Sequence, residues 1–163
     1  GQVLYKPFNS NFNISFEGFY VKQREYDQTF KFRKYKTTTA HLNLGYLFPM
    51  GVESNISYGR YLAKDDGFTF DLSKRTKSGF RAGIYFTRTN VSAELFGEGS
   101  FDKGIFLRIP LDNILQNGRK SVSKTRIRPI QRDGGARLEG FSGDMWWDIR
   151  DARFDLFANP IRR

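Results

Sequence analysis

The chain contains no cysteine and a single histidine, His41. The missing cysteine excludes a disulfide framework and thiolate metal sites, and one histidine cannot form a His-rich metal site or a His-pair relay. No serine stands in a G-x-S-x-G elbow, and the sequence has neither a P-loop nor a dinucleotide-binding fingerprint. We therefore expect no cofactor, no metal site and no catalytic residues.

Long apolar runs are also missing. No stretch approaches the ~18 consecutive apolar residues that a membrane-spanning helix needs. The strands of a membrane barrel are not excluded, because they need only about ten residues that are apolar at alternate positions. Their polar partners also lower the mean hydropathy, which is −0.57 in this chain.

Aromatic residues are abundant and supply much of the apolar material. They make up 17% of the 163 residues, and 17 residues are phenylalanine. They are spread over many short segments, which suits strands rather than helices. The length suits one domain, which we place at residues 1–163.

The net charge is +10 at pH 7, and such a surface attracts phosphate. However, no zinc finger, recognition helix or RNA-binding aromatic motif is present, so we expect no nucleic-acid partner. The basic residues gather at Lys31–Lys36 and Arg119–Arg132. We interpret these segments as solvated strand ends that face anionic lipid headgroups or sugars.

Alternation of apolar and polar residues predicts the fold class. Ala40, Leu42 and Leu44 alternate with His41 and Asn43 in the clearest of these segments. Further alternating strands are predicted from the following residues: Gly1, Phe12, Val52, Phe68, Phe80, Ile105 and Val122. The sequence therefore predicts an all-β protein.

The connections between these strands alternate in length. Short turns are predicted at Asn9–Asn11, Pro49–Gly51 and Lys77–Gly79, whereas longer or more charged connections are predicted at Lys22–Lys36, Lys64–Gly67 and Thr87–Ser100. Short turns at one end and long loops at the other are typical of an outer-membrane barrel. We predict an antiparallel up-and-down transmembrane β-barrel of about eight to ten strands.

A polar set lies opposite the apolar positions of these strands. In a soluble barrel it would face water, and in a membrane barrel it would fill the lumen; alternation alone does not choose between the two. The mixed charges and intervening small residues favour the lumen, where opposite charges pair. The candidate lumen network is Glu17, His41, Glu53, Asp71, Arg81 and Arg108.

Several motifs resemble a known family. They are G-R-Y-L-A-K-D-D-G-F-T-F-D-L-S (Gly59–Ser73), F-T-R-T-N-V-S-A-E-L-F-G-E-G-S-F-D-K-G-I (Phe86–Ile105), I-P-L (Ile109–Leu111) and R-D-G-G-A-R-L (Arg132–Leu138). Together they are similar to the C-terminal part of the YjbH family, which includes the GfcD proteins, over roughly the first 138 residues.

The resemblance implies an outer-membrane β-barrel of Gram-negative bacteria that takes part in exopolysaccharide or capsule production and export, with no known catalytic activity. Because family members are several times longer and are thought to carry more than one barrel, we expect this chain to be one barrel of such a protein. The tail from Asp144 to Phe157 is predicted to form a closing strand or strand pair, with a short amphipathic helix as the alternative. The chain ends at Pro160–Arg163 without the usual terminal aromatic residue of outer-membrane barrels, so the assignment of the last strand stays open.

A Gly-rich loop motif begins within the third longer connection and continues past its end. This connection is far longer than the roughly two to five residues that a hairpin requires, so chain reversal alone does not explain it. The residues of the motif are Phe96, Gly97, Glu98, Gly99, Ser100, Phe101, Asp102, Lys103 and Gly104. Glu94, Glu98 and Asp102 could act as paired carboxylates in glycoside chemistry, but a flexible loop does not hold two carboxyl groups at a fixed separation. We expect Asp102 and Lys103 to pair or to fix the loop instead.

Aromatic and cationic residues are predicted to meet at the long-loop end. Planar rings and guanidinium groups there could hold an acidic polysaccharide, and the alternative is an aromatic girdle with cations that face lipopolysaccharide. The possible saccharide contacts are Tyr26, Arg33, Tyr35, Tyr61 and Arg88.

These observations predict a non-catalytic structural or accessory role in the bacterial outer membrane. The expected partners are outer-membrane lipid or lipopolysaccharide, with exopolysaccharide and other secretion proteins as further candidates. The alternatives are a soluble ligand-binding β-barrel and a carbohydrate-active enzyme.

Overall fold

A computed structural model describes residues 1–27, 31–76, 80–91, 102–110, 122–127, 134–138 and 145. Within these ranges the chain forms eight strands and one short 3-10 turn. The elements are β1 (Gln2–Tyr5), β2 (Phe12–Arg24), β3 (Phe32–Leu47), η1 (Pro49–Gly51), β4 (Val52–Arg60), β5 (Asp66–Arg75), β6 (Arg81–Thr89), β7 (Asp102–Pro110) and β8 (Val122–Ile127).

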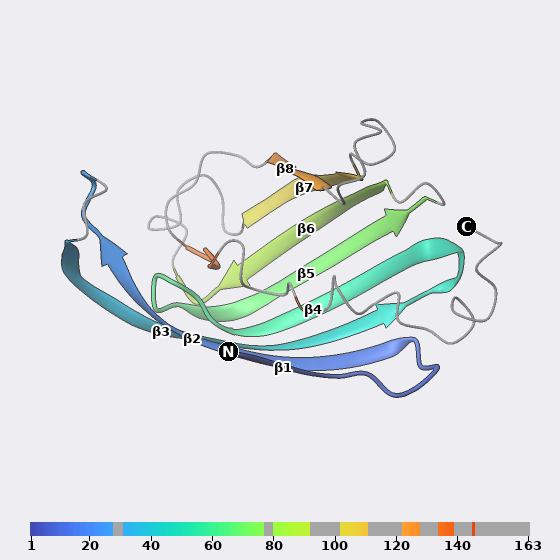
Figure 1. The fold of residues 1–163 in the computed structure, drawn as a ribbon, viewed down its shortest axis with the longest axis horizontal. Coiled ribbons are helices and arrows are strands. Elements are labelled where there is room, and N and C mark those ends of the chain that lie inside the picture. The colour runs from blue at the N-terminus through green and yellow to red at the C-terminus, as the bar shows by residue number, and fades with distance from the viewer. Residues whose placement is uncertain are drawn as a thin grey trace.

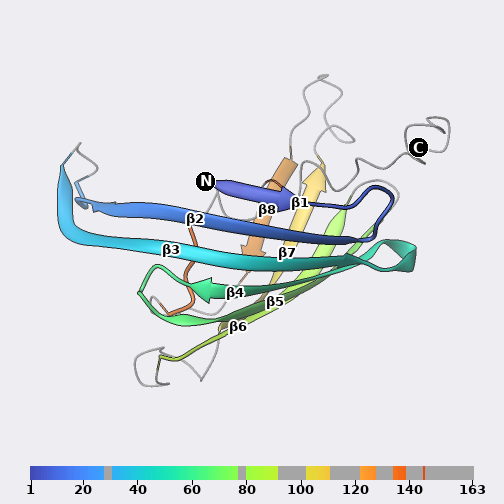
Figure 2. The same cartoon turned by 90° about the horizontal axis from the view of Figure 1, so that it is seen from below.

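All eight strands belong to one sheet, in the order in which they occur along the chain. Each strand is antiparallel to the next. The predicted all-β, antiparallel up-and-down topology is therefore confirmed. The sheet is open, with β1 and β8 at its two edges, and it is strongly curved (Figures 1 and 2).

The hairpin of β2 and β3 extends beyond the rest of the sheet, as Figure 2 shows. Ala40 of β3 pairs with Arg60, the last residue of β4, so β3 residues 32–39 have no partner in β4. On the other side, β2 and β3 stay paired out to Arg24 and Phe32. Much of the connection predicted at Lys22–Lys36 thus belongs to the strands of one long projecting hairpin.

The strand register sorts side chains into alternating rows across the sheet. Leu44, Ile56, Phe70 and Phe86 lie directly opposite one another on four successive strands. A neighbouring row on the other face is polar, and it runs through Asn43, Ser57, Thr69, Thr87 and Asp102. Residues alternate between faces along a strand, so the period-2 pattern of the sequence becomes one apolar and one polar face.

The apolar row belongs to a face that we call the outer face, and its large side chains are exposed. They include Phe12, Phe16, Tyr20, Leu42, Leu44, Tyr46, Ile56, Tyr58, Phe68, Leu72, Ile84, Phe86, Ile105 and Ile127. The polar row belongs to the inner face, where polar side chains are buried. These are Asn13, Glu17, Thr37, Thr39, His41, Asn43, Glu53, Ser57, Thr69, Ser73, Arg81, Thr87 and Asp102.

The inner face is the concave face of the sheet. The side chain of Arg81 on β6 reaches Glu53 on β4, across the intervening strand β5. The sheet is strongly curved (Figures 1 and 2), and curvature toward this face brings side chains of strands that are not neighbours closer together. The burial pattern is therefore the reverse of that of a water-soluble sheet, which packs its apolar face away from water.

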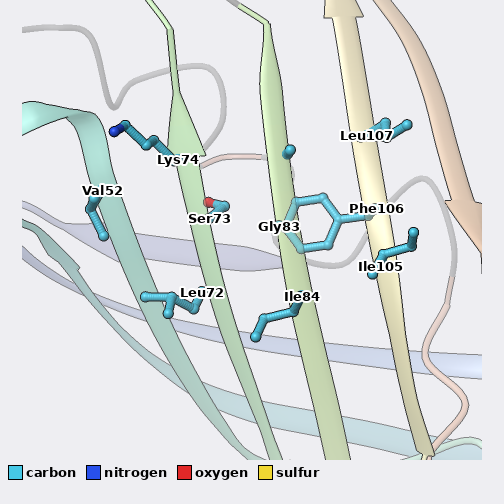
Figure 3. Close-up of a pocket in the computed structure, with 10 residues that line it drawn as sticks. Val52, Leu72, Ser73, Lys74, Gly83, Ile84, Ile105, Phe106 and Leu107 are labelled. Carbon is cyan, nitrogen blue, oxygen red and sulfur yellow. The ribbon is translucent and has the colours of Figure 1, made fainter.

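Glycines on the inner face make room for aromatic rings. Gly83 lies opposite Phe106, and Gly104 lies opposite Tyr85. A Cβ atom on Gly83 would come within 2.4 Å of the Phe106 ring, and one on Gly104 would come within 2.8 Å of the Tyr85 ring. Figure 3 shows the Phe106 ring over the β6 backbone at Gly83. Each ring thus covers bare backbone of the facing strand.

The turn between β3 and β4 has the backbone geometry that its sequence predicts. Met50 and Gly51 both have positive φ angles, of 63° and 73°. A Cβ atom on Gly51 would also come within 2.7 Å of the carbonyl oxygen of Arg75. The tight turn at Pro49–Gly51 is therefore confirmed, and its glycine is required by both the φ angle and the close approach.

Predicted strand boundaries were wrong at three connections. Of the connection predicted at Lys22–Lys36, residues 22–24 belong to β2 and residues 32–36 to β3; of the one predicted at Lys64–Gly67, Asp66 and Gly67 belong to β5. Thr87, Arg88 and Thr89 belong to β6, and Asp102, Lys103 and Gly104 are the first residues of β7 rather than part of the loop. Asp102 is buried on the inner face, whereas Lys103 is exposed on the outer face. The two side chains lie on opposite sides of β7 because adjacent residues of a strand point in opposite directions.

Several predictions fall on residues outside the described ranges. These are the loop residues Phe96–Phe101, the turn at Lys77–Gly79, the connection after Pro110 and the closing strand predicted in the tail. Within the ranges that the structure describes, no helix is long and apolar enough to cross a lipid bilayer.

Candidate functional site

A buried ion pair joins β4 to β6 on the inner face. Arg81, which is 1% exposed, donates from both terminal nitrogens to the two carboxylate oxygens of Glu53, and the Nη2–Oε1 distance is 2.6 Å. Arg81 Nη1 also donates to Ser73 Oγ on β5 over 3.1 Å. Two parallel hydrogen bonds make this a fork-to-fork pair, which fixes both side chains in the concave interior.

A second cluster lies on the β2, β3 and β4 side of the same face. Nδ1 of His41 is 3.3 Å from Oε1 of Glu17. Ser57 Oγ donates to Asn43 Oδ1 over 2.5 Å. Arg137 completes the cluster: its Nη2 donates to Glu17 and, over 3.2 Å, to Asn43, while its Nη1 donates to Ser57 over 3.0 Å. One guanidinium therefore joins three neighbouring strands and neutralises the buried carboxylate of Glu17.

The short segment of residues 134–138 carries Arg137 into this cluster; it is drawn in orange-red in Figure 1. The amide of Gly135 donates to Asp65 Oδ2 over 2.8 Å, and the amide of Leu62 donates to the carbonyl of Ala136 over 2.9 Å. Two contacts with the turn between β4 and β5 thus anchor the segment. Both glycines of the segment, Gly134 and Gly135, are buried.

Sequence reasoning missed Arg137 as a member of the inner polar network. In the sequence, the R-D-G-G-A-R-L motif supports only the family resemblance and does not indicate a contact with the inner face. Arg137 lies 120 residues from Glu17 along the chain, and strand periodicity carries no information about such a contact. The available signal was the motif itself, which places an arginine shortly after two glycines.

Replacing Arg137 with glutamine is expected to cost about 1–3 kcal/mol of folding free energy, because the buried Glu17 carboxylate loses its charged donor. Urea unfolding in lipid vesicles or detergent measures the change. The control is R33Q, at an exposed pair in which Arg33 Nε lies 4.0 Å from Glu25 and both side chains are about 40% exposed. Equal effects of R137Q and R33Q would contradict a neutralising role for Arg137.

Hydroxyl groups connect the remaining inner strands. The Tyr61 hydroxyl lies 2.6 Å from Thr69 Oγ1, which lies 2.7 Å from Thr87 Oγ1. Tyr85 donates to Asp102 over a longer distance of 3.4 Å. These contacts continue the polar row from β4 to β7, so the inner face is lined with hydrogen-bonding groups over most of its width.

The structure brings four of the six candidate lumen residues into two pairs, Glu17 with His41 and Glu53 with Arg81. Asp71 and Arg108 lie on the same face and are half-buried. All six thus share the inner face. The buried glutamates each contact an arginine, which is an arrangement for charge neutralisation rather than for acid–base chemistry.

The candidate saccharide contacts do not form one surface. Tyr26 and Arg33 lie together at the tip of the projecting hairpin, where the guanidinium carbon is 4.6 Å from the ring centroid. Tyr35 donates to the carbonyl of Leu62 over 2.6 Å. Tyr61, by contrast, is fully buried on the inner face, and Arg88 lies on β6, two strands away from β4. Tyr61 therefore has no exposed ring with which to contact a polymer.

The carboxylates proposed for glycoside chemistry are not brought together by the described structure. Glu94 and Glu98 lie outside the described residues, and Asp102 is buried against Tyr85. Among the residues that the structure does describe, no group of three or more His, Cys, Asp or Glu side chains is placed to hold a metal ion.

Charged residues bound the apolar outer face at both ends. Lys74 lies at the end that holds the short turns, and Arg60, Asp66, Arg88 and Lys103 lie at the other end. Arg60 donates two hydrogen bonds of 2.9 Å to Asp66. These hydrogen bonds lower the pKa of the Asp66 carboxyl. The exposed apolar residues between the two ends form a continuous band.

Comparison with known proteins identifies the family. A family model described as "Exopolysaccharide biosynthesis protein YbjH" matches residues 1–150. The "Uncharacterized lipoprotein YjbH" of Escherichia coli (strain K12) is 39% identical over 142 residues, which cover 84% of this chain and 20% of the relative. The chain thus spans about a fifth of the length of that relative. No solved structure matches it.

The family model covers most of the chain, including the hairpins, the inner polar network and the segment that carries Arg137. The resemblance that the sequence motifs predicted is therefore confirmed, and the chain belongs to the YjbH family of exopolysaccharide biosynthesis proteins.

Proposed function

We propose that the chain is an outer-membrane β-barrel domain with a non-catalytic accessory role in exopolysaccharide or capsule production and export. The observation that carries the proposal is the reversed burial of its sheet. Polar and charged side chains are buried on the concave inner face, while leucine, isoleucine and phenylalanine side chains are exposed on the outer face.

Lipid is the environment that suits such an outer face. In water, a continuous exposed band of large apolar side chains would favour aggregation. In a bilayer, the same band contacts acyl chains, and the charged residues at its two ends reach the headgroups. Tyr20, Tyr46 and Tyr58 are exposed on this face, as expected of aromatic residues near an interface. A soluble ligand-binding barrel would require the opposite orientation.

The inner face suits the lumen of a small barrel. Arg81 and Arg137 neutralise Glu53 and Glu17, and several of the hydroxyl and amide groups around them form hydrogen bonds with one another, so the charges need no bulk water. Eight strands give an interior just wide enough for side chains to fill, whereas porins with an aqueous channel have sixteen or more strands. A filled lumen supports an accessory role rather than an open polymer channel.

Closure of the barrel is part of the proposal, because a membrane barrel cannot leave unpaired edges in lipid. The edges at issue are β1 and β8. The amide of Met145 donates to the side chain of Gln2 on β1 over 3.3 Å, so the chain that follows β8 returns to the opposite edge. This contact favours closure between the two ends of the sheet.

Single-cysteine labelling tests the orientation, and the absence of native cysteine in the chain makes it direct. I56C on the outer face and A63C on the turn between β4 and β5 are compared in intact membranes, in the protein at its native length. Both positions are exposed. A water-soluble maleimide is expected to label A63C and to leave I56C unmodified until detergent displaces the lipid. Equal labelling rates in intact membranes would contradict the proposal.

Bacterial strains that lack the protein or produce either cysteine variant test the accessory role. The amount of exopolysaccharide outside the cell is expected to fall when the protein is deleted and to recover with either cysteine variant. Unchanged exopolysaccharide in the deletion strain would contradict the role in production or export, while leaving the membrane orientation to the labelling result.

A further inference from the structure

A cationic hollow lies where the apolar band meets the projecting hairpin. It is lined by Tyr20 of β2, Lys36 and Thr38 of β3, Arg60 at the end of β4 and Lys64 of the following turn. The Tyr20 ring is 62% exposed. The hollow thus joins three cations to an interfacial aromatic residue at one border of the outer face.

The register adds a fourth cation. Lys22 of β2 lies directly opposite Lys36 of β3, on the same face. Like charges placed directly opposite each other destabilise an antiparallel pair. Within the described part of the chain, no carboxylate forms an ion pair with Lys22, Lys36 or Lys64. An anion between the two strands would remove this repulsion.

The position of the hollow indicates which anion it binds. A ligand there has its charged part beside Lys22 and Lys36 and its remaining part beside the exposed apolar rings of the band. A soluble acidic polymer has no acyl chains to contact that band, whereas a phosphorylated lipid has both parts. Lysine ammonium groups bind phosphate as compact point charges, and they do not need the two-pronged geometry of an arginine guanidinium.

The side of the membrane also follows from the fold. The hollow lies at the end that carries the projecting hairpin of β2 and β3 and the connection between β6 and β7 at 90–101, whereas the tight turn at η1 and the connection between β7 and β8 at 111–121 lie at the opposite end. Outer-membrane barrels place their longer extensions outside the cell. The projecting hairpin thus assigns the hollow to the outer leaflet, whose lipid is lipopolysaccharide.

We propose that Lys22, Lys36 and Lys64, together with Tyr20 and Arg60, form a binding site for the phosphate groups of lipid A in the outer leaflet. The site rests on the proposed membrane orientation. Each lysine or arginine near an anionic lipid surface strengthens the electrostatic attraction between protein and lipid. Loss of two lysines is therefore expected to weaken lipid A binding about thirtyfold at low salt.

The test uses the protein at its native length, purified in detergent, with diphosphorylated lipid A as the probe. K22Q/K36Q is compared with K6Q/K74Q, which removes the same charge at the opposite end of the sheet. Binding is measured by native mass spectrometry or by calorimetry. We expect the first variant to lose about thirtyfold in affinity, the second to bind like the wild type, and dephosphorylated lipid A to bind weakly to all three.

A charge reversal separates binding from stability. K22E places opposite charges across the two strands, so it is expected to raise the unfolding midpoint while it weakens lipid A binding. Lower stability together with weaker binding would instead indicate a structural role for Lys22 and would overturn the proposed site.

Three other outcomes would overturn the site: unchanged affinity of K22Q/K36Q, an equal loss in K6Q/K74Q, or tighter binding of an acidic polysaccharide than of lipid A. The cysteine labelling is repeated on the same variants. A protected I56C position with unchanged lipid A affinity contradicts the phosphate site alone, whereas a freely labelled I56C position contradicts the membrane orientation.

Discussion

Replacing Arg81 with methionine is expected to lower the free energy of unfolding by about 3–5 kcal/mol, since it leaves a buried carboxylate without a partner. Arg81 is 1% exposed and Glu53 is 7% exposed, so water does not reach the carboxylate readily. The guanidinium donates to Ser73 as well, so the variant also removes a contact between β5 and β6. Urea unfolding in lipid vesicles measures the change.

The double variant E53M/R81M distinguishes the cost of an unpaired buried carboxylate from the cost of lost side-chain packing. Removing both charges leaves no buried carboxylate, and apolar replacement of a buried ion pair is often neutral or even stabilising by about 1–4 kcal/mol. We therefore expect the double variant to be more stable than R81M alone. If it were as unstable as R81M, the loss would come from packing, and the account of Glu53 and Arg81 as a neutralised pair would be wrong.

The second large effect is expected on the outer face. Leu44 is 39% exposed and lies between Ile14 of β2 and Ile56 of β4 in an apolar row. An arginine at such a position costs about 2–4 kcal/mol at the bilayer midplane, because the charge must leave water. On a water-exposed strand the same substitution changes stability by no more than about 0.5 kcal/mol.

Thr38 provides the matched control for L44R. It is exposed on the same strand and the same face, but it lies at the border beside Lys36 and Arg60. T38R is expected to cost only about 0–1 kcal/mol, as for charges near the interface. A cost for L44R no larger than that for T38R, measured by unfolding in vesicles, would argue against lipid contact at Leu44.

The sequence predicted the strands well because apolar and polar residues alternate with little interruption. Ala40, Leu42 and Leu44 are followed by Tyr46, and their partners His41 and Asn43 are buried on the inner face as the pattern requires. The tight turn at Pro49–Gly51 was equally clear, since its glycine has a positive φ angle. Local chemistry determines both features, so the local sequence reveals them.

Strand ends were less predictable where polar residues continue the strand. β3 begins at Phe32, eight residues before Ala40, because Phe32, Lys36 and Thr38 pair with β2. At β7 the strand begins at Asp102, although glycine and charge suggested a loop. Backbone pairing with a neighbouring strand extends such segments, and a single strand's own sequence does not display it.

The membership of the inner network depended on contacts that are distant in the sequence. Alternation placed Glu17, His41, Glu53 and Arg81 on one face, but it did not say which of them would meet. The curvature of the sheet decides that Arg81 reaches Glu53 across β5, and the return of residues 134–138 decides that Arg137 reaches Glu17. The alternation of apolar and polar residues along a strand predicts neither of these two contacts.

The glycine–aromatic pairs of β6 and β7 also fix the pairing register of these two strands. A shift of β7 by two residues would keep every side chain on its own face, so alternation alone does not oppose it. Shifted one way, Gly83 would meet Gly104 and leave a void; shifted the other way, the rings of Tyr85 and Phe106 would compete for one space. The observed pairs, Gly83 with Phe106 and Tyr85 with Gly104, therefore act as an alignment key between the two strands.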